Sequence, residues 1–342
     1  MITSTSNIQS LLAQRQRYDS LAARIGNTPF YQHPKLADLF QIKHLWIKDE
    51  SSNLTGTVKD RKSLEFLNST SNDCSYITIT NGNMGYSLGT IVGEKSRVIS
   101  IVDKSTTEYI KEKLAEVSIV VEQDLRNNRL TQEDLNDITK TLSNPAKQKW
   151  SFDMETQCND PYHRLMQELA LDLQKVDLLK RNISLIVPLG GGELMSSCLS
   201  HILSCVTGHT LYRQWNFYHT IGVTERENFS KKISRRMDYE SIHWPIEEKE
   251  YIADKLLTSY IPAGAKRTIT QALRKKNAEV IAVSTKDIIQ AYTLLHQHNI
   301  KVEPSSAAAF AGLWSLKNKP EHIIIINTGE GVYDKEIMNR RK

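Results

Sequence analysis

The sequence has no hydrophobic run long enough to cross a membrane. Its most apolar stretch, Ile323 to Ile326, is far shorter than the roughly 20 residues that a membrane-spanning helix requires. The first residues, MITSTSNIQSLL, lack the basic segment and apolar core of a secretory leader. We therefore expect a cytoplasmic protein that does not interact with membranes.

Cysteine is scarce, and its spacing argues against the common structural metal sites. The four cysteines form no CxxC pair and have no histidines at ligand spacing. They are Cys74, Cys158, Cys198 and Cys205. The sequence therefore predicts neither a disulfide framework nor a metal site, and Cys198 and Cys205 are expected to be small core residues of a helix.

The sequence also lacks a strong excess of charge of one sign. A formal net charge of +5 is small for 342 residues, and the basic clusters have no interleaved aromatic residues. These clusters are Lys231-Lys232 with Arg235-Arg236, and Arg274 to Lys276. We expect no nucleic-acid partner, and a small anionic substrate fits the charge equally well.

Short apolar runs rich in β-branched residues alternate with helical patterns along most of the chain. Such alternation predicts an α/β fold with parallel sheets covered by helices on both faces. The stretch between residues 121 and 183 has few strand signals, which suggests two lobes: a smaller one over 50–155, and a larger one from 1–49 and 156–342. The predicted strands are Leu45–Ile47, Ile77–Thr80, Val98–Val102, Ile119–Val121, Ile183–Pro188, Ile221–Val223, Val280–Val283 and Ile323–Asn327.

A triple glycine, Gly190, Gly191 and Gly192, ends one buried strand and precedes a helical pattern. Consecutive glycines let backbone amides converge on an anion, and the positive end of the following helix attracts it. The loop is neither a P-loop, since no GK[ST] follows, nor a GxGxxG fingerprint. It predicts a phosphate site, and the alternatives are a flexible strand-to-helix turn or a nucleotide-phosphate enzyme.

Two further strands also end in glycine-containing turns. TITNGNMGYSLG, from Thr78 to Gly89, offers asparagine amides and positive-φ backbone suited to a carboxylate or a ring oxygen. IIIINTGEGVYD, from Ile323 to Asp334, ends a buried strand at Thr328. Ligands of open α/β sheets collect beyond the carboxyl ends of strands, so both turns are candidate binding segments.

Six motifs in this order resemble the pyridoxal-phosphate enzymes of the tryptophan synthase β-subunit superfamily, fold type II. The resemblance covers nearly the whole chain. The motifs are IGNTPFYQHPKLAD (25–38), IKDESSNLTGTVKDR (47–61), the asparagine loop, the triple glycine, VEPSSAAAFAGL (302–313) and the TGEG strand end.

The resemblance implies a role for each candidate residue, with the cofactor in the cleft between the two lobes of a homodimeric enzyme. Lys59 is the Schiff-base lysine and then the general base at Cα. Asn83 contacts the cofactor's ring hydroxyl, the triple glycine binds its phosphate, and Thr328 faces its pyridine nitrogen. The implied substrate-binding residues are Asn81, Gly82, Met84 and Gly85.

The motifs favour different members of the superfamily. The EPSSAAAFAGL and TGEG segments resemble threonine synthase, the leading interpretation, whereas IGNTP resembles cysteine synthase and cystathionine β-synthase. The proline before the glycine loop is shared with serine and threonine dehydratases. In each case the expected reaction is elimination or replacement of a β- or γ-substituent of an amino acid.

Three residues depart from the family pattern. Met84 replaces a hydroxyl residue in the asparagine loop, Glu193 replaces a fourth glycine, and Glu330 takes a position often held by histidine. These departures suggest an unusual substrate or reduced activity. They leave open a catalytically altered relative that acts as a binding protein.

Overall fold

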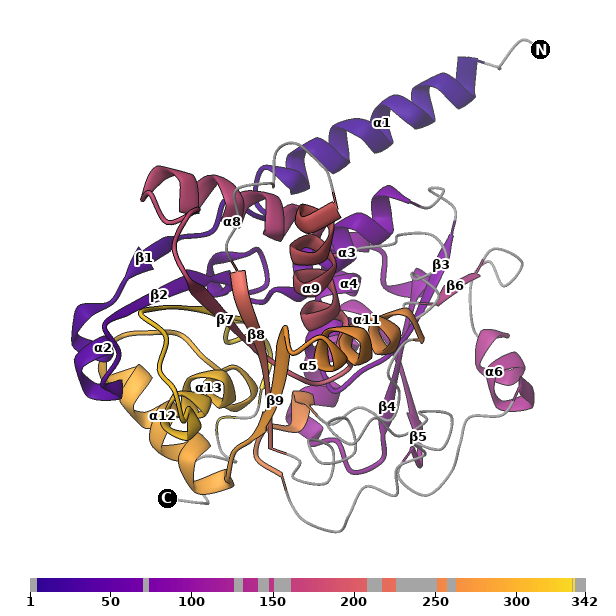
Figure 1. The fold of residues 1–342 in the computed structure, drawn as a ribbon. Coiled ribbons are helices and arrows are strands. Elements are labelled where there is room, and N and C mark those ends of the chain that lie inside the picture. The colour runs from indigo at the N-terminus through magenta and orange to yellow at the C-terminus, as the bar shows by residue number, and fades with distance from the viewer. Residues whose placement is uncertain are drawn as a thin grey trace. The chain divides into compact units, whose positions relative to one another are not determined.

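The computed structural model describes residues 5–69, 74–125, 132–140, 148–150, 161–207, 217–225, 251–256, 263–333 and 335 (Figure 1). The chain folds into two compact units. The first comprises Met1–Gly26 and Asn53–Pro161, and the second comprises Asn27–Ser52 and Tyr162–Lys342.

The first unit contains a four-stranded parallel sheet in the order β5-β4-β3-β6. Its apolar strands alternate with helices, as a parallel sheet requires. The strands are β3 (Ser75–Ile79), β4 (Val98–Asp103), β5 (Ile119–Gln123) and β6 (Gln148–Trp150). The helices are α1 (Thr5–Ala22), α3 (Lys59–Asn68), α4 (Asn83–Val92), α5 (Glu108–Val117) and α6 (Gln132–Thr139).

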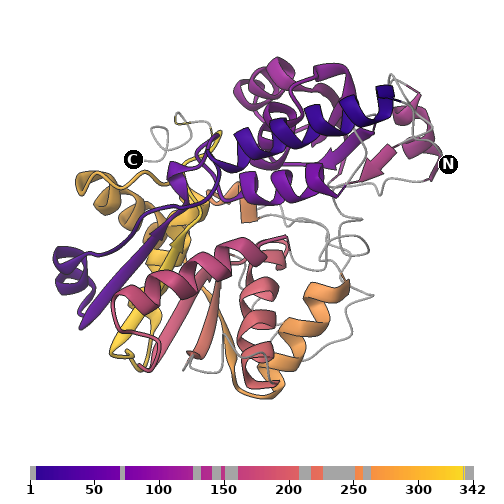
Figure 2. The same cartoon turned by 90° about the horizontal axis from the view of Figure 1, so that it is seen from above.

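The N-terminal helix belongs to the first unit, although the sequence suggested placing residues 1–49 with the larger lobe. Helix α1 packs against α3 (Figure 2). Tyr18 and Ile25 are buried in a cluster with Leu64 and Phe66 of α3. This burial of apolar surface groups residues 1–26 with the smaller unit.

The second unit is built on a six-stranded sheet in the order β1-β2-β10-β7-β8-β9. All neighbours are parallel except the edge strand β1. The strands are β1 (Phe30–Gln32), β2 (His44–Asp49), β7 (Ile183–Pro188), β8 (Phe217–Thr224), β9 (Ala278–Ala282) and β10 (His322–Asn327). The helices are α2 (Pro34–Phe40), α8 (His163–Lys175), α9 (Glu193–Thr207), α11 (Ala263–Arg274), α12 (Thr285–Gln297) and α13 (Pro304–Ala311).

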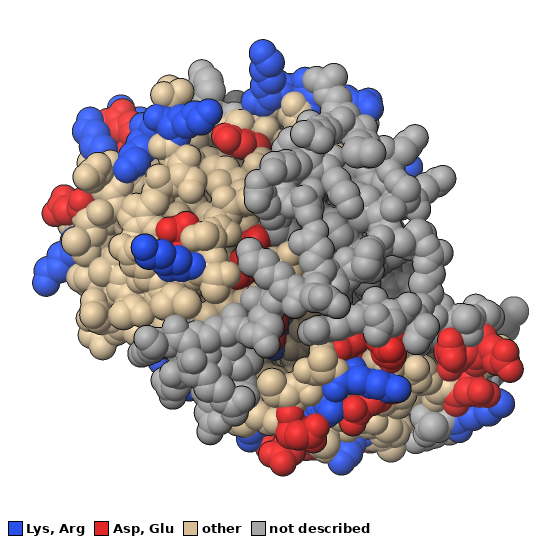
Figure 3. All heavy atoms as spheres, turned by 90° about the horizontal axis from the view of Figure 1, so that it is seen from below, with Lys and Arg blue, Asp and Glu red and all other residues tan. Residues whose placement is uncertain are grey.

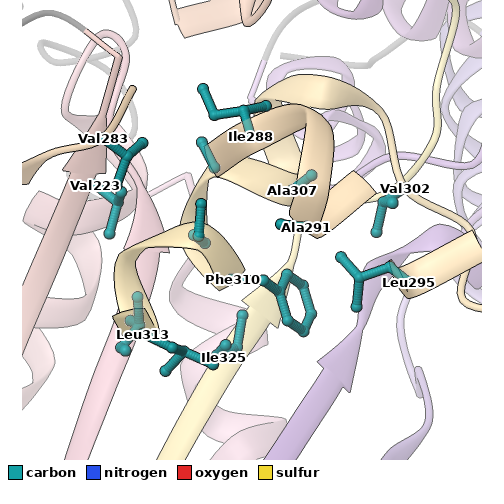
Figure 4. Close-up of a cluster of buried hydrophobic side chains, with 14 of the residues drawn as sticks. Val223, Val283, Ile288, Ala291, Leu295, Val302, Ala307, Phe310, Leu313 and Ile325 are labelled. Carbon is teal, nitrogen blue, oxygen red and sulfur yellow. The ribbon is translucent and has the colours of Figure 1, made fainter. Parts of the chain in front are cut away.

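The core of the second unit lies between this sheet and helices α12 and α13. All residues of α13 are buried, and Phe310 packs with Leu295 of α12 and Ile325 of β10 (Figure 4). Central strand β10 is buried along its whole length, which explains its four consecutive isoleucines, because a parallel strand is covered on both faces.

All eight predicted strands are present, and the predicted α/β fold is confirmed. The two strands that the sequence did not predict, β1 and β6, have three residues each, too few to show a period. Most of the charged segment 229–255, including the basic cluster Lys231-Lys232 with Arg235-Arg236, lies outside the described residues.

Among the described helices, none is long and apolar enough to span a bilayer. On the face shown in Figure 3, basic and acidic side chains of the described residues are interspersed. That described surface therefore has no large patch of a single charge.

Candidate active site

Lys59 is the first residue of α3, and its side chain is half-buried. The turn before it is held by several bonds. Gly56, at φ 77°, donates its amide to the Asn53 carbonyl at 2.9 Å. The buried Asp60 carboxylate accepts the Thr55 amide at 2.6 Å and also the Thr55 hydroxyl. The lysine therefore projects from a backbone that is fixed on both sides.

The asparagine loop is organised by a buried threonine that follows β3. The Thr80 hydroxyl accepts the amides of Gly82 at 3.0 Å and Gly85 at 3.1 Å. Gly82 has φ 125°, a backbone conformation that favours glycine. Asn83 then begins α4 with its side chain buried. Thr80 therefore holds the turn that presents Asn81 and Asn83.

Two of the predicted substrate-binding residues of this loop, Met84 and Gly85, pack against other parts of the first unit. Met84 is buried in the cluster that contains Leu64 and Leu88. A Cβ on Gly85 would lie 2.5 Å from Ser100 Oγ and 2.8 Å from Leu114 Cδ2, so glycine permits the close packing of α4 on the sheet. The methionine that departs from the family pattern is thus part of the apolar core.

Helices α3 and α4 pack against each other, and Ser87 Oγ donates to Ser63 Oγ at 2.8 Å in the buried contact. This packing fixes the helix that begins at Lys59 relative to the helix that begins at Asn83. Both residues belong to the first unit.

In the second unit, the triple glycine joins β7 to α9. Gly192 has φ 78°, and its carbonyl accepts the amide of Ser196, the fourth residue of α9, at 2.8 Å. A Cβ on Gly190 would lie 3.2 Å from both Leu256 Cα and the Lys255 carbonyl oxygen. Glycine therefore lets the segment 251–256 approach the loop closely.

The sequence did not indicate the residue that holds this segment, Glu225. The buried carboxylate of Glu225 accepts the amides of Ile252 at 3.3 Å and Ala253 at 2.8 Å. It also accepts the Thr285 hydroxyl at 2.6 Å. Glu225 thus fixes the backbone that contacts the glycine loop, and nothing in the local sequence around it signals this long-range role.

Thr328 follows β10 and is held by a hydrogen-bond network. Its amide donates to Ser306 Oγ at 2.9 Å, and Ser306 Oγ donates to Asn327 Oδ1 at 2.7 Å. The Asn327 amide group donates to Asp49 Oδ1 at 2.8 Å and to the Lys301 carbonyl at 3.0 Å. The Thr328 hydroxyl makes no hydrogen bond within the described part of the chain.

The glycine loop and Thr328 lie at the same edge of the sheet, because they follow the carboxyl ends of two neighbouring parallel strands, β7 and β10. This edge is where ligands bind in open α/β sheets. The structure thus brings together the two elements of the second unit that the sequence singled out.

The two acidic departures have local explanations. Glu193 is the first residue of α9, where the helix dipole favours a carboxylate. Glu330 forms an ion pair with Lys335 at 2.7 Å.

The sequence matches the family described as "Pyridoxal-phosphate dependent enzyme" over residues 21–329. Among curated proteins none matches. Solved structures share the fold at low identity. L-serine ammonia-lyase from Rhizomucor miehei has a TM-score of 0.64 at 15% identity, covering 93% of this chain and 99% of that one. Maize serine racemase has 0.67 at 15% (96% and 95%), and threonine deaminase isoform 2 from Solanum lycopersicum has 0.66 at 17% (99% and 93%).

Proposed function

Because this chain belongs to the family of pyridoxal-phosphate dependent enzymes, we propose that it eliminates or replaces a β- or γ-substituent of an amino acid. When bound, pyridoxal phosphate supplies the electron sink for negative charge at the substrate Cα. The residues proposed to hold it are Lys59 and Asn83 of the first unit and Gly190, Gly191, Gly192 and Thr328 of the second.

The residues present fit this cofactor. The glycine loop precedes the 15-residue helix α9, whose positive end suits a phosphate dianion. At the same sheet edge, the Thr328 hydroxyl has no partner among the described residues and so remains available to a ring nitrogen.

Lys59 is assigned two tasks. Its amine would bind the cofactor and, once the substrate amine has taken that place, accept the proton from the substrate Cα. The hydrogen-bonded turn before α3 supports this assignment, because a general base must be held within reach of the proton it removes.

Thr328 is the observation that carries the reaction class. A neutral hydroxyl does not hold the cofactor's ring nitrogen protonated, so the electron sink is weaker than with a carboxylate partner. Long-lived negative charge at Cα is then disfavoured, and early departure of a leaving group is favoured. The Ser306 and Asn327 bonds that fix the Thr328 backbone support this positioning role.

The leading substrate assignment is threonine synthase-like, with a γ-substituted amino acid such as O-phosphohomoserine. It rests on the resemblance of the α13 segment, which holds Thr328 through Ser306. The second candidate is β-elimination or replacement on serine, threonine or an O-substituted serine. It is supported by the IGNTP motif and by the substrates in the names of the similar structures.

The structural roles of IGNTP weaken it as a substrate signal. Gly26 donates its amide to Asn53 Oδ1 at 2.9 Å. The Thr28 hydroxyl donates to buried Glu50 at 2.6 Å, and the Thr28 carbonyl accepts from Lys48 at 2.8 Å. Because these residues serve the scaffold, we rank the β-substituted substrates second.

The test is product release from a panel of amino acids by the pyridoxal-phosphate-loaded protein. The panel comprises O-phosphohomoserine, O-phosphoserine, O-acetylserine, serine and threonine, and the products assayed are phosphate, acetate and ammonia. We expect phosphate from O-phosphohomoserine, and loss of that release in Lys59→Ala. Release only from serine derivatives would establish the second candidate. No release from any of them by cofactor-loaded protein would contradict both and favour a catalytically altered binding protein.

A further inference from the structure

Two histidines and a glutamate meet where β2 and β10 begin. His44 and His322 are register partners on these adjacent parallel strands, and their rings stack with centroids 4.7 Å apart and an interplanar angle of 15°. One nitrogen or oxygen from each of His44, Glu321 and His322 lies within 4.8 Å of the others. The strand register thus creates a compact cluster of ligand atoms.

One ring nitrogen of His322 is unsatisfied. The residue is only 8% exposed, and its Nδ1 has no hydrogen-bond partner among the described residues. Leaving a buried polar atom unpaired is unfavourable.

We propose that His44, Glu321 and His322 bind a single Zn²⁺ ion, or a similar divalent transition-metal ion, once one of the two stacked rings turns so that both nitrogen lone pairs point to the ion. Two imidazoles and one carboxylate are ligands that Zn²⁺ prefers, with water in the remaining position. Gln32 lies 3.0 Å from His44 Nδ1 through its side-chain amide. With that amide flipped, its oxygen would accept the Nδ1–H and orient the ring, as groups around metal-bound histidines do.

The surrounding charges define which ions the site takes. Lys43 forms an ion pair with Glu321 at 2.5 Å, and Arg181 is a second cation near His322. These cations oppose any metal ion, and binding must displace Lys43 from the carboxylate. Affinity must therefore come from the imidazoles, which bind Zn²⁺ well but not Mg²⁺ or Ca²⁺.

The site is separate from the proposed cofactor residues. Thr328 is six residues beyond His322 along β10, which is roughly 20 Å in an extended strand. A metal at the amino ends would join β2 to β10, the two strands whose carboxyl ends carry Asp49 and Asn327. The sequence predicted no metal site, because the ligands are far apart in the chain and only sheet register brings them together.

The test is Zn²⁺ binding by the full-length, untagged, pyridoxal-phosphate-loaded protein, measured by competition with a chromogenic chelator. We expect the wild type to bind one Zn²⁺ at this site and Mg²⁺ not to compete. His322→Gln and Glu321→Gln should each weaken binding at least tenfold. The matched control is His163→Gln, because His163 also lies beside a second histidine, His201, with ring centroids 5.8 Å apart; it should leave this affinity unchanged.

Lys43→Met tests the same site in the opposite direction. Removing the ammonium that competes for Glu321 should tighten Zn²⁺ binding several-fold, and both Lys43 and Glu321 are surface residues whose replacement is compatible with folding. The proposal is overturned if the wild type binds no Zn²⁺, or if Glu321→Gln and Lys43→Met both bind it as the wild type does. None of these readouts depends on the proposed enzymatic activity.

Discussion

At the scale of single residues, Thr80 has the clearest structural task. Its hydroxyl is the acceptor for two buried amides of the asparagine loop. Thr80→Val keeps the shape but leaves both amides unpaired, so the free energy of unfolding should fall by about 1–3 kcal/mol. Urea denaturation measures this loss.

The control for Thr80→Val lies in the helix that follows the loop. The buried Thr90 Oγ1 finds no hydrogen-bond partner in the described structure, so Thr90→Val should leave stability unchanged or raise it. Equal losses in the two variants would show that the Thr80 hydroxyl does not organise the loop.

Asn327 is the second residue whose removal gives a defined result. Its side chain uses all four hydrogen-bonding positions, donating to Asp49 and Lys301 and accepting from Ser306 and Gly329. Asn327→Leu should lower the free energy of unfolding by about 3–5 kcal/mol.

A graded variant checks this account of the network. Ser306→Ala removes only the bonds to Asn327 and to the Thr328 amide, so we expect a smaller loss of about 1–2 kcal/mol. If Ser306→Ala were less stable than Asn327→Leu in the same denaturation assay, the result would be inconsistent with the network.

At the scale of elements, helix α2 has a pH-sensitive cap. His33 Nδ1 accepts the Leu36 amide at 3.2 Å, and protonation would remove this acceptor. Burial lowers the pKa of His33, as do neighbouring His298 and, more weakly, Lys35, and a backbone hydrogen bond opposes them without cancelling them. The Tyr31 ring also lies near His33. The folded state therefore binds this proton less readily than the unfolded state.

The sign of the pH effect follows from that lowered pKa. The contribution of His33 is complete above the unfolded pKa of about 6.5 and is lost as the pH falls below it. His33→Asn keeps a capping acceptor that does not titrate. Between pH 7 and pH 5 the variant should lose about 1 kcal/mol less stability than the wild type. Identical losses in thermal unfolding at the two pH values would contradict this.

Local sequence patterns predicted the longer strands and the glycine loop. The eight longer strands followed from continuous apolar runs, and the glycine loop followed from a strand that ends in three glycines. Strands β1 and β6 gave no such signal, because three residues are too few for periodicity. The pairing of His44 with His322 could not be predicted from local sequence either, because it arises from the register of two strands that are distant in the chain.

At the scale of the whole molecule, the order of the motifs along the chain indicated the protein family better than any single motif did. Six weak motifs in sequence led to the family that the match over residues 21–329 establishes. The supporting residues Glu225, Ser306 and Asn327 were missed, because most of their partners are distant in the chain: Thr285 is 60 positions from Glu225, and Asp49 is 278 positions from Asn327. The burial of Met84 in the apolar core and the close packing of Gly85 against Ser100 and Leu114 were not foreseen either, because both arise from tertiary packing.

The central claim is that Lys59 holds the cofactor, and two lysines that are more deeply buried provide a comparison within the same protein. Lys48 is 1% exposed and bonded to Asp172, and Lys62 is 4% exposed. Borohydride reduction of the pyridoxal-phosphate-loaded protein fixes the cofactor to its lysine, and peptide mass mapping then locates it. We predict that the added mass lies on Lys59 alone and is absent from Lys59→Ala. Labelling of Lys48, Lys62 or another lysine, or no labelling of protein saturated with cofactor, would contradict the account.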